Sequence, residues 1–296
     1  MRFTKMQGIG NDYIYLDCVR GKAPENPSGL SRKISDRHFG AGSDGLVLIC
    51  PSERADFRMA MFNADGSESE MCGNASRCIG KYVYERGLTD KKEITLETGA
   101  GIRTLLLDTV NDKVVSVRVD MGVPRLQPDE IPVDPRLGAS LPRGERVSGK
   151  TGTEGRTIIG APLEVNGRTF RITCVSMGNP HCVVFQDEVE DWPVGKWGPC
   201  FENHPLFPER TNTEFAKVLD RETIRMRVWE RGSGETMACG TGACATLAAA
   251  VLNGLTERKA TLLLNGGSLE IFWDERTDHI LMTGPAEFVY DGDWPG

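Results

Sequence analysis

Two cysteines, Cys72 and Cys239, stand in matching surroundings in the two halves of this 296-residue chain. They lie 167 positions apart (239 − 72), and each is followed by a glycine and then by a residue with a hydrogen-bonding side chain. The same offset aligns Arg58 with Arg225, and it holds for the surrounding residues as well. A repeat of this length predicts two duplicated halves, each of which contributes one equivalent cysteine.

The position of each cysteine, directly before a predicted helix, suggests acid–base chemistry beside a bound carboxylate. The free N–H groups and the dipole at a helix N-terminus attract anions. They also favour the thiolate form of a neighbouring cysteine, with a pKa about one unit below ~8.5. One cysteine, as thiolate, would remove a proton from the carbon beside the carboxylate, and the other, as thiol, would return one from the opposite face. Such a reaction inverts the stereocentre.

The alternatives for this pair are a structural helix start, a zinc site and a dithiol redox centre. Cysteine is a poor helix-capping residue compared with Ser, Thr, Asn or Asp. Zinc sites favour C-x₂₋₄-C pairs. Cys78 follows Cys72 after five residues, outside this spacing, and Cys244 follows Cys239 after four, at its upper limit. Neither pair has the C-x-x-C spacing of a redox dithiol. The glycine runs match neither G-x-G-x-x-G nor the P-loop, so we expect no metal and no cofactor.

The helices that must position the cysteines are expected at equivalent places. The first runs from Cys72 to about Arg86 and is closed by Gly87. The second follows Cys239 and ends at Gly254. Because this second helix is apolar on every side, we expect strands to wrap around it.

Short strands are predicted before and after each of these helices. A further short helix is expected at 29–38, and strands at 57–63, 93–98, 102–108, 114–120, 170–175, 181–186, 214–219 and 223–230. The pattern predicts an α+β fold of two pseudo-symmetric domains. Each domain is a mixed, mostly antiparallel, curled and barrel-like sheet around a central helix, with the active site in the cleft between them.

The domain boundaries follow from the repeat. The first domain is expected to span 1–122, completed by a C-terminal strand at about 286–296, and the second to span 123–285. Residues 123–162 are rich in proline and glycine. This composition predicts a crossing connection with an irregular surface loop rather than a third domain.

Bulk composition narrows the class of protein. The formal net charge is −7 and no cluster of Lys and Arg supplies a footprint for phosphates, so we expect no nucleic-acid partner. No segment approaches the ~18 apolar residues of a membrane span, and the chain begins with a strand-like run rather than a signal peptide. The nine cysteines are odd in number and several lie in apolar runs. We therefore expect free thiols and a reducing cytoplasm.

Seven short motifs, spread along essentially the whole chain, match those of a known family. They are Gly8-Ile-Gly-Asn-Asp12, Phe62-Asn-Ala-Asp-Gly-Ser67, Cys72-Gly-Asn74, Met177-Gly-Asn-Pro-His-Cys-Val183, Arg210-Thr-Asn212, Glu230-Arg-Gly-Ser-Gly-Glu-Thr236 and Ala238-Cys-Gly-Thr-Gly-Ala243. Together they resemble the diaminopimelate epimerases, cofactor-free isomerases of lysine and peptidoglycan biosynthesis. The resemblance implies epimerisation of LL-2,6-diaminopimelate to meso-diaminopimelate by two thiols, a small-molecule substrate and a homodimer.

The resemblance also implies roles for individual residues. Cys72 and Cys239 are the acid–base thiols, and His181 and Glu230 support catalysis. The residues implied to cradle the reacting carboxylate are Gly73, Asn74, Gly240 and Thr241. Those implied to bind the rest of the substrate are Asn11, Asn63, Asn179, Asn212, Glu230 and Arg231. Tyr290 matches a tyrosine at the family's dimer interface.

Some of these roles leave alternatives open. Taken alone, His181 is a satisfied core histidine, and Glu230 either forms a salt bridge or tunes Cys239. Gly45 replaces a glutamine that some family members place at the pocket edge, and Ala75-Ser76 replaces the residues more often seen after Cys-Gly-Asn. A racemase of another amino acid, such as histidine, is therefore the alternative within the class, and a thiol redox protein the alternative outside it.

Overall fold

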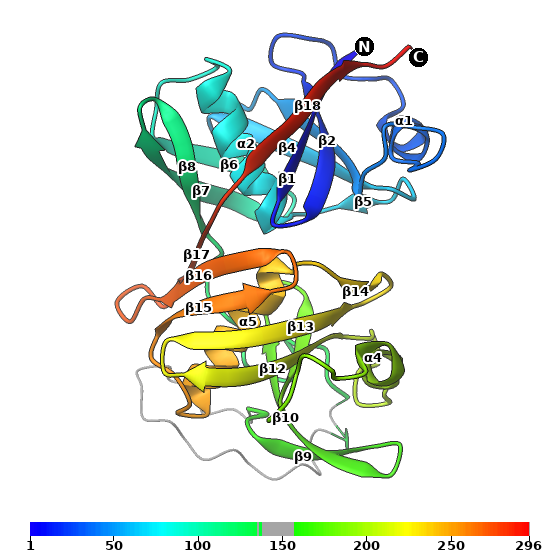
Figure 1. Cartoon of the computed structure of the whole chain (residues 1–296), viewed down its shortest axis with the longest axis vertical. Helices are drawn as coiled ribbons and strands as arrows, with labels where there is room; N and C mark the ends of the chain where they lie inside the picture. Colours follow the sequence, from blue (N-terminus) through cyan, green and yellow to red (C-terminus); the bar gives the residue numbers. More distant parts are fainter. Residues whose placement is uncertain (135, 138–156, 296) are drawn as a thin grey trace. The chain divides into compact units, whose positions relative to one another are not determined.

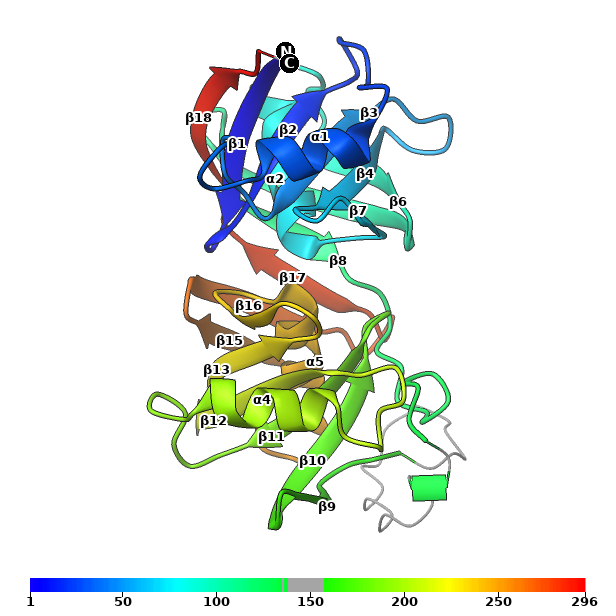
Figure 2. The ribbon, with the colours of Figure 1, turned by 90° about the vertical axis from the view of Figure 1, so that its right-hand side faces the viewer.

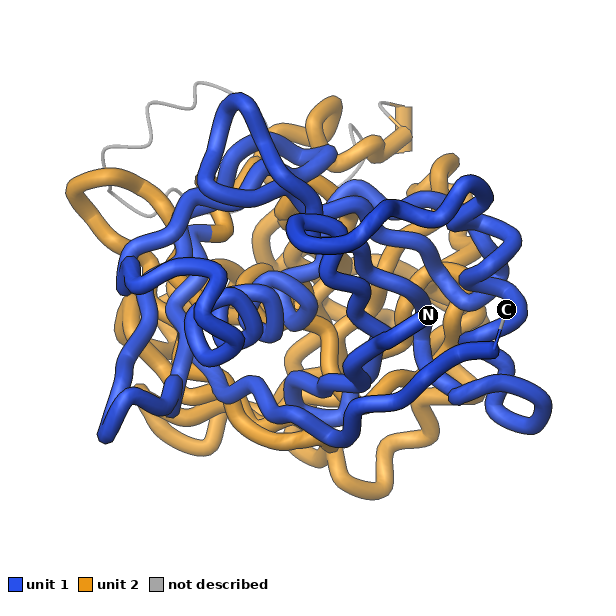
Figure 3. The backbone as a smooth tube through the Cα atoms, turned by 90° about the horizontal axis from the view of Figure 1, so that it is seen from above, with its two compact units in different colours: residues 1–120, 283–296 blue, residues 121–282 orange. Residues whose placement is uncertain are grey.

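The computed structural model describes residues 1–134, 136–137 and 157–295, and the chain divides into two compact units (Figure 1). Unit 1 comprises Met1–Asp120 and Thr283–Gly296, and unit 2 comprises Met121–Met282 (Figure 3). Of the connection predicted at 123–162, residues 135 and 138–156 lie outside the described residues. Each unit has an apolar core of its own.

Unit 1 is built from short strands and two helices. Its strands are β1 (Arg2–Gly8), β2 (Asn11–Asp17), β3 (Gly45–Cys50), β4 (Phe57–Asn63), β5 (Glu68–Ser69), β6 (Glu93–Thr98), β7 (Gly101–Val110), β8 (Lys113–Asp120) and β18 (Glu287–Asp293). Its helices are α1 (Pro27–Ile34) and α2 (Gly73–Glu85).

Unit 2 repeats this order of elements. Its strands are β9 (Ala161–Val165), β10 (Arg168–Ser176), β11 (Pro180–Phe185), β12 (Asn212–Asp220), β13 (Thr223–Glu230), β14 (Gly234–Thr236), β15 (Lys259–Leu264) and β16 (Gly267–Trp273). Its helices are α4 (Val194–Glu202) and α5 (Gly240–Leu252), and β17 (Ile280–Gly284) leads the chain back into unit 1.

Strand pairing confirms the duplication. In unit 1, β2 runs parallel to β3 and β4 runs parallel to β6, and in unit 2 the equivalent pairs β11–β12 and β13–β15 are also parallel. The hairpins β1–β2, β3–β4 and β6–β7, with their counterparts β10–β11, β12–β13 and β15–β16, are antiparallel. The predicted α+β class, with a mixed and mostly antiparallel sheet, is therefore confirmed.

One helix occupies the middle of each unit, as the composition of the second helix predicted. Helix α2 packs against β1, β7 and β8, and α5 packs against β10, β12 and β16 (Figures 1 and 2). Almost every side chain of α5 is buried. Its alanines let the strands approach closely, so a helix without a polar face is stable only because the sheet surrounds it.

The ends of the two central helices lie where the sequence predicted them. Each begins at the glycine after its cysteine and spans 13 residues. The chain leaves each helix through a glycine with a left-handed backbone, φ +67° at Gly87 and φ +69° at Gly254. This conformation costs glycine less than any other residue, which is why glycine marks both ends.

The short helix expected at 29–38 is wrong in its bounds, because α1 spans Pro27–Ile34. The Asn26 side chain accepts the Gly29 N–H and caps the helix early, with Pro27 in the first turn. The Asp36 carboxylate accepts the N–H groups of His38 and Phe39, so a turn replaces the last part of the expected helix.

Leu247 tests the importance of the wrapped helix. It is fully buried on α5, so Leu247→Ala should lower the free energy of unfolding by about 2–5 kcal/mol. Leu219, on β12, is 50% exposed and serves as the control, with an expected loss within about 0.5 kcal/mol for Leu219→Ala. Urea unfolding followed by circular dichroism measures both values, and equal small losses would contradict the packing described.

Candidate functional site

The first cysteine, Cys72, lies directly before α2 with an extended backbone (φ −135°, ψ 122°). Its thiol donates a hydrogen bond to Asn11 Oδ1 at 3.4 Å, and Asn74 Nδ2 donates to the same oxygen at 3.2 Å. Asn11 Nδ2 in turn donates to Asp44 Oδ2 at 2.8 Å. The structure therefore brings together three predicted site residues of unit 1, Asn11, Cys72 and Asn74, and Gly73 is the first residue of the adjoining helix.

Asn63 lies at the end of β4, and its Nδ2 donates to Ser67 Oγ at 3.0 Å. It faces Gly45 across the β3–β4 register. A Cβ atom at Gly45 would collide with the carbonyl oxygen of Phe62, so this backbone admits no side chain there. A polar contact from a side chain at position 45, such as a glutamine would make, is consequently missing.

The second cysteine, Cys239, lies before α5 in the same extended conformation (φ −121°, ψ 110°). Its sulfur accepts the Gly242 N–H at 3.4 Å and lies 3.4 Å from Thr241 Oγ1. The residue is 5% exposed, and Gly240 is buried beside it. Cys239 therefore uses one of the free N–H groups of the helix start, which is the position the repeat predicted.

His181 lies on β11 and is fully buried. Its Nδ1 is 2.7 Å from Glu214 Oε1, and its Nε2 is 3.1 Å from Asn179 Oδ1. Asn179 Nδ2 then donates to Thr241 Oγ1 at 3.3 Å. A continuous line of hydrogen bonds runs from Glu214 through His181 and Asn179 to the hydroxyl beside Cys239.

Glu230, the last residue of β13, is also brought to Cys239. Its carboxylate accepts hydrogen bonds from the Thr236 hydroxyl and from the Cys239 thiol. Burial raises the pKa of Glu230 above its ordinary value, and these two hydrogen bonds oppose the rise. Its hydrogen bonds in the described part of the chain thus come from a hydroxyl and the cysteine, and the nearby His181 also opposes the rise in the pKa of Glu230.

Asn212 and Arg231 lie next to each other in unit 2. Asn212 is buried, its Nδ2 donates to the Pro180 carbonyl at 2.8 Å, and its Oδ1 accepts the Arg231 N–H at 3.0 Å. The Arg231 guanidinium donates to the Glu209 carbonyl at 3.0 Å. In this structure Asn212 therefore fixes the backbone at which the Arg231 side chain begins.

The ionisation expected for Cys239 is wrong in direction. The helix N-terminus was expected to lower the pKa of the thiol, but burial raises the pKa of Cys239 well above its ordinary value. The negative charges of Glu230 and Glu214 add to this rise, while hydrogen bonds from Thr241 and Gly242 oppose it. A helix dipole contributes ~0.3–2 kcal/mol, which is too little to offset the burial of a charge beside two carboxylates.

All nine cysteines are free thiols. Among the described residues, no group of three or more His, Cys, Asp or Glu side chains is arranged to hold a metal ion. In the same part of the chain, no helix has both the length and the apolar character needed to cross a membrane.

Tyr290 lies on β18 of unit 1 and is 42% exposed. Its hydroxyl donates to the Ala41 carbonyl at 3.1 Å, and its ring meets the edge of Phe3.

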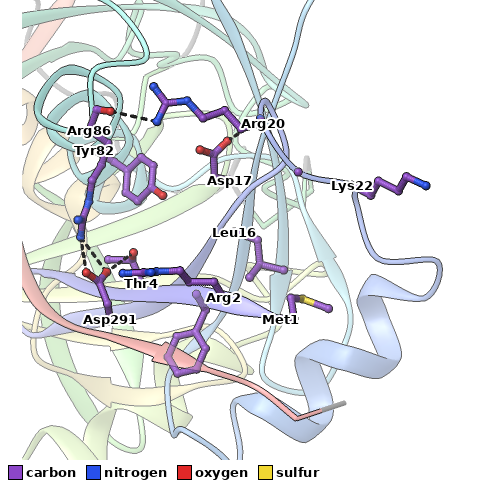
Figure 4. Close-up of a pocket in the computed structure, with 12 residues that line it drawn as sticks. Met1, Arg2, Thr4, Leu16, Asp17, Arg20, Lys22, Tyr82, Arg86 and Asp291 are labelled. Atoms are coloured by element: carbon purple, nitrogen blue, oxygen red, sulfur yellow. Dashed lines mark hydrogen bonds and ion pairs between the residues drawn. The ribbon is translucent and has the colours of Figure 1, made fainter.

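A pocket of about 480 Å³ lies in unit 1, and in it Arg86 and Asp291 form an ion pair at 2.7 Å (Figure 4). None of the predicted catalytic or substrate-binding residues lines this pocket.

Sequence reasoning missed residues that contact the predicted site, among them Asp44, Thr236 and Glu214. Asp44 accepts a hydrogen bond from Asn11, Thr236 donates one to Glu230, and Glu214 contacts His181. Glu214 opens the strand predicted at 214–219, which also contains Lys217, so its charge alone did not mark it as a buried residue.

Solved structures define the fold. A protein of the PhzF phenazine biosynthesis family from Bacillus anthracis superposes with a TM-score of 0.67 at 17% identity, covering 99% of this chain and 98% of that one. A hydroxyproline epimerase from Agrobacterium vitis gives a TM-score of 0.64 at 13% identity, with coverage of 99% and 90%. The chain thus has the duplicated fold that these two proteins share.

Sequence comparison then identifies the family. The family model described as diaminopimelate epimerase matches residues 3–127 and 173–289. A diaminopimelate epimerase from Acetivibrio thermocellus is 56% identical over 293 residues, covering 99% of this chain and 98% of that protein. One from Methanococcus maripaludis is 53% identical over 293 residues, covering 99% of each. The chain belongs to the diaminopimelate epimerase family.

The buried thiols predict a loss of stability in alkaline solution. The pKa of Cys239 is raised, and burial raises the pKa of Cys78 to about 11, whereas a thiol of the unfolded chain ionises near ~8.5. Above that pH the unfolded state releases protons that the folded state keeps. The free energy of unfolding should therefore fall as pH rises, by up to ~1.4 kcal/mol per pH unit for each such thiol.

Cys239→Ala removes one of these thiols and should reduce that slope between about pH 9 and 10. Leu247→Ala is the control, because it lowers stability at every pH without changing the number of titrating groups. Urea unfolding at a series of pH values gives the slopes, and an unchanged slope in Cys239→Ala would contradict the raised pKa.

Proposed function

We propose that this chain epimerises LL-2,6-diaminopimelate to meso-diaminopimelate with two cysteine thiols and no cofactor, in the formation of lysine and peptidoglycan precursors. The observation that carries the proposal is the presence of Cys72 and Cys239 at the same N-terminal position of two equivalent helices. Identities of 50–56% with proteins named diaminopimelate epimerase support this substrate over another amino acid such as histidine.

In the proposed reaction the two sulfurs act on the α-carbon from opposite faces. Cys72, as thiolate, removes the α-hydrogen, and Cys239, as thiol, supplies a hydrogen to the other face. After the reaction Cys72 is the thiol and Cys239 is the thiolate. The two cysteines therefore exchange roles when the opposite configuration is bound. The raised pKa of Cys239 supports its role as the acid when the LL isomer reacts.

The helix starts supply the electrostatic part of the mechanism. Removal of the α-hydrogen moves negative charge onto the substrate carboxylate, so fixed donors must be present before the reaction begins. Gly73 and Asn74 at the start of α2, and Gly240 and Thr241 at the start of α5, offer N–H groups without net charge. We propose that these four residues bind the reacting carboxylate.

The remaining substrate groups require different partners. We propose that Arg231 binds the distal carboxylate, since a guanidinium pairs with a carboxylate through two parallel hydrogen bonds. The side chains proposed to bind the amino groups and the distal carboxylate are those of Asn11, Asn63, Asn179, Asn212 and Glu230. Amide side chains can both donate and accept, so they bind a zwitterion without adding charge.

Support for catalysis is proposed for His181 and Glu230. Glu230 accepts a hydrogen bond from the Cys239 thiol, and His181 reaches the same cysteine through Asn179 and Thr241. These contacts support a role for both residues in controlling when the Cys239 sulfur holds its hydrogen.

We further propose a cytoplasmic homodimer. Nine free thiols suit a reducing compartment. The dimer contact is proposed at Tyr290, which is exposed on a strand of unit 1 together with Val289, itself 51% exposed. Exposed aromatic and aliphatic side chains on one strand are typical of subunit contacts.

Single replacements of the two cysteines test the reaction. Cys72→Ala and Cys239→Ala should each lower the rate of inversion by at least about 10³-fold, because either change removes one of the two proton-transfer groups. The measurement is the conversion of LL-diaminopimelate, followed by chiral chromatography. Cys200→Ser, on α4 and partly exposed, is the matched control with an expected rate within about twofold of the wild type. Wild-type turnover by either alanine variant would reject the two-thiol mechanism.

Tyr290→Ala tests the proposed dimer. Sedimentation velocity should show a dimer for the wild type and a dissociation constant at least about tenfold higher for the variant, since exposed aromatic anchors contribute strongly to interfaces. Val115→Ala, at a 52% exposed position on β8, is the control and should leave the constant unchanged. A monomeric wild type, or equal constants for both variants, would contradict this assignment.

A further inference from the structure

Glu214 is a buried carboxylate in the line of hydrogen bonds that ends at Cys239. It lies on β12 and is fully buried, and its Oε1 is 2.7 Å from His181 Nδ1. Its other oxygen, Oε2, is buried without a hydrogen-bond partner within the described part of the chain. Burial of a carboxylate is costly, and here the histidine compensates only one of its two oxygens.

The start of α5 is shaped to admit this carboxylate. A Cβ atom at Gly242 would lie 2.7 Å from Glu214 Oε1 and 3.3 Å from the Cys239 sulfur. Any residue larger than glycine at this position would therefore displace the carboxylate or the thiol. Gly242 thus allows Glu214 to reach the same helix start that holds Cys239.

The geometry fixes which nitrogen of His181 faces Asn179. A carboxylate only accepts, so Nδ1 of the ring donates its hydrogen to Glu214. The other nitrogen, Nε2, lies 3.1 Å from Asn179 Oδ1. This oxygen only accepts, so the contact is a hydrogen bond when Nε2 also carries a hydrogen. The Asn179 amide continues to the Thr241 hydroxyl, which lies 3.4 Å from the sulfur of Cys239.

We propose that Glu214 is a positioning residue for the Cys239 thiol: its carboxylate fixes the His181 ring and, through Asn179 and Thr241, the groups that surround the sulfur. The inference rests on the proposed catalytic role of Cys239. It assigns to Glu214 no contact with substrate. The negative charge of Glu214 has a second effect, because it favours the protonated form of the Cys239 thiol.

Glu214 also distinguishes the two halves of the repeat. In the first half of the repeat, Val47 is equivalent to Glu214 at the offset of 167 (214 − 47). Tyr13 is equivalent to His181 at the offset of 168 (181 − 13), which also aligns Gly10 with Gly178. Val47 and Tyr13 are both buried in unit 1. The first half therefore has no carboxylate at this position.

The other titratable groups around Cys239 are few enough to be separated by experiment. Glu230 on β13 raises the pKa of Cys239 together with Glu214, and His181 on β11 lies between Glu214 and Asn179. Burial raises the pKa of Cys182 on β11, and Cys174 on β10 and then Glu214 add to this rise.

Glu214→Gln tests the proposal, because it removes the charge and preserves the size of the side chain. The titration of Cys239 is read from the ultraviolet absorbance of its thiolate, as the difference between each variant and the same variant carrying Cys239→Ala. In Glu214→Gln the midpoint of the Cys239 titration should lie at least about half a pH unit below that of the wild type. The alkaline limb of the pH profile of kcat/KM should move in the same direction. The value of kcat should fall about tenfold while KM changes less than about threefold.

Glu214→Asp and Glu202→Gln complete the design. Glu214→Asp keeps the charge but shortens the reach to His181, so the Cys239 titration should stay near that of the wild type while kcat falls. Glu202 is another buried carboxylate of unit 2, bonded to Trp229 and Arg210. Glu202→Gln should leave the Cys239 titration unchanged, which controls for the loss of any buried charge.

The outcomes separate this proposal from the proposed function. An unshifted Cys239 titration and pH profile in Glu214→Gln would overturn the positioning role, even if the wild type epimerises diaminopimelate. An equal shift in Glu202→Gln would overturn it as well. The titration needs no substrate, so a shift confined to Glu214→Gln would support the role of Glu214 even if the wild type left diaminopimelate unchanged.

Discussion

The wrapping of an apolar helix by a curled sheet is the constraint on which the rest of this structure depends. A helix such as α5, with no polar face, has no stable position at a surface, so its axis and its start are set by the surrounding strands. The residue before the helix is then held in an extended conformation, with free N–H groups directly after it. Cysteine at that position places a sulfur beside anion-binding donors, and the duplication repeats the arrangement in unit 1.

The two sulfurs nevertheless lie in different surroundings. In unit 1 the Cys72 thiol donates to the amide oxygen of Asn11, which also accepts a hydrogen bond from Asn74. In unit 2 the neighbours of Cys239 include the carboxylates of Glu230 and Glu214. A duplicated fold supplies two equivalent positions, and substitutions in the neighbouring strands make them chemically unequal. A two-base reaction benefits from this inequality, because one group must hold a proton while the other lacks one.

Much of the architecture could be predicted from the sequence, since the signals were local. Gly87 and Gly254 stop the central helices where a left-handed backbone is needed, and the glycines after the cysteines mark their starts. The bounds of α1 were missed because the cap at Asn26 and the turn at Asp36 depend on particular side-chain hydrogen bonds. Periodicity does not report such bonds.

The site was less accessible to sequence reasoning, because its contacts join residues far apart in the chain. The partnership of His181 with Glu214 spans 33 positions and depends on the parallel pairing of β11 with β12. The shift in the pKa of Cys239 was predicted in the wrong direction. The helix start is visible from the sequence, whereas the depth of burial and the nearby carboxylates are not. Asn212, identified by its motif, bonds to two backbone groups that no motif could have indicated.

The most direct test of the account is the isotope content and configuration of the product formed from LL-diaminopimelate in D₂O. Two thiols acting from opposite faces should yield meso-diaminopimelate with one deuterium at the inverted carbon, while LL-diaminopimelate recovered early in the reaction remains unlabelled. Inversion without deuterium, or deuterium in the recovered substrate before any product forms, would contradict it.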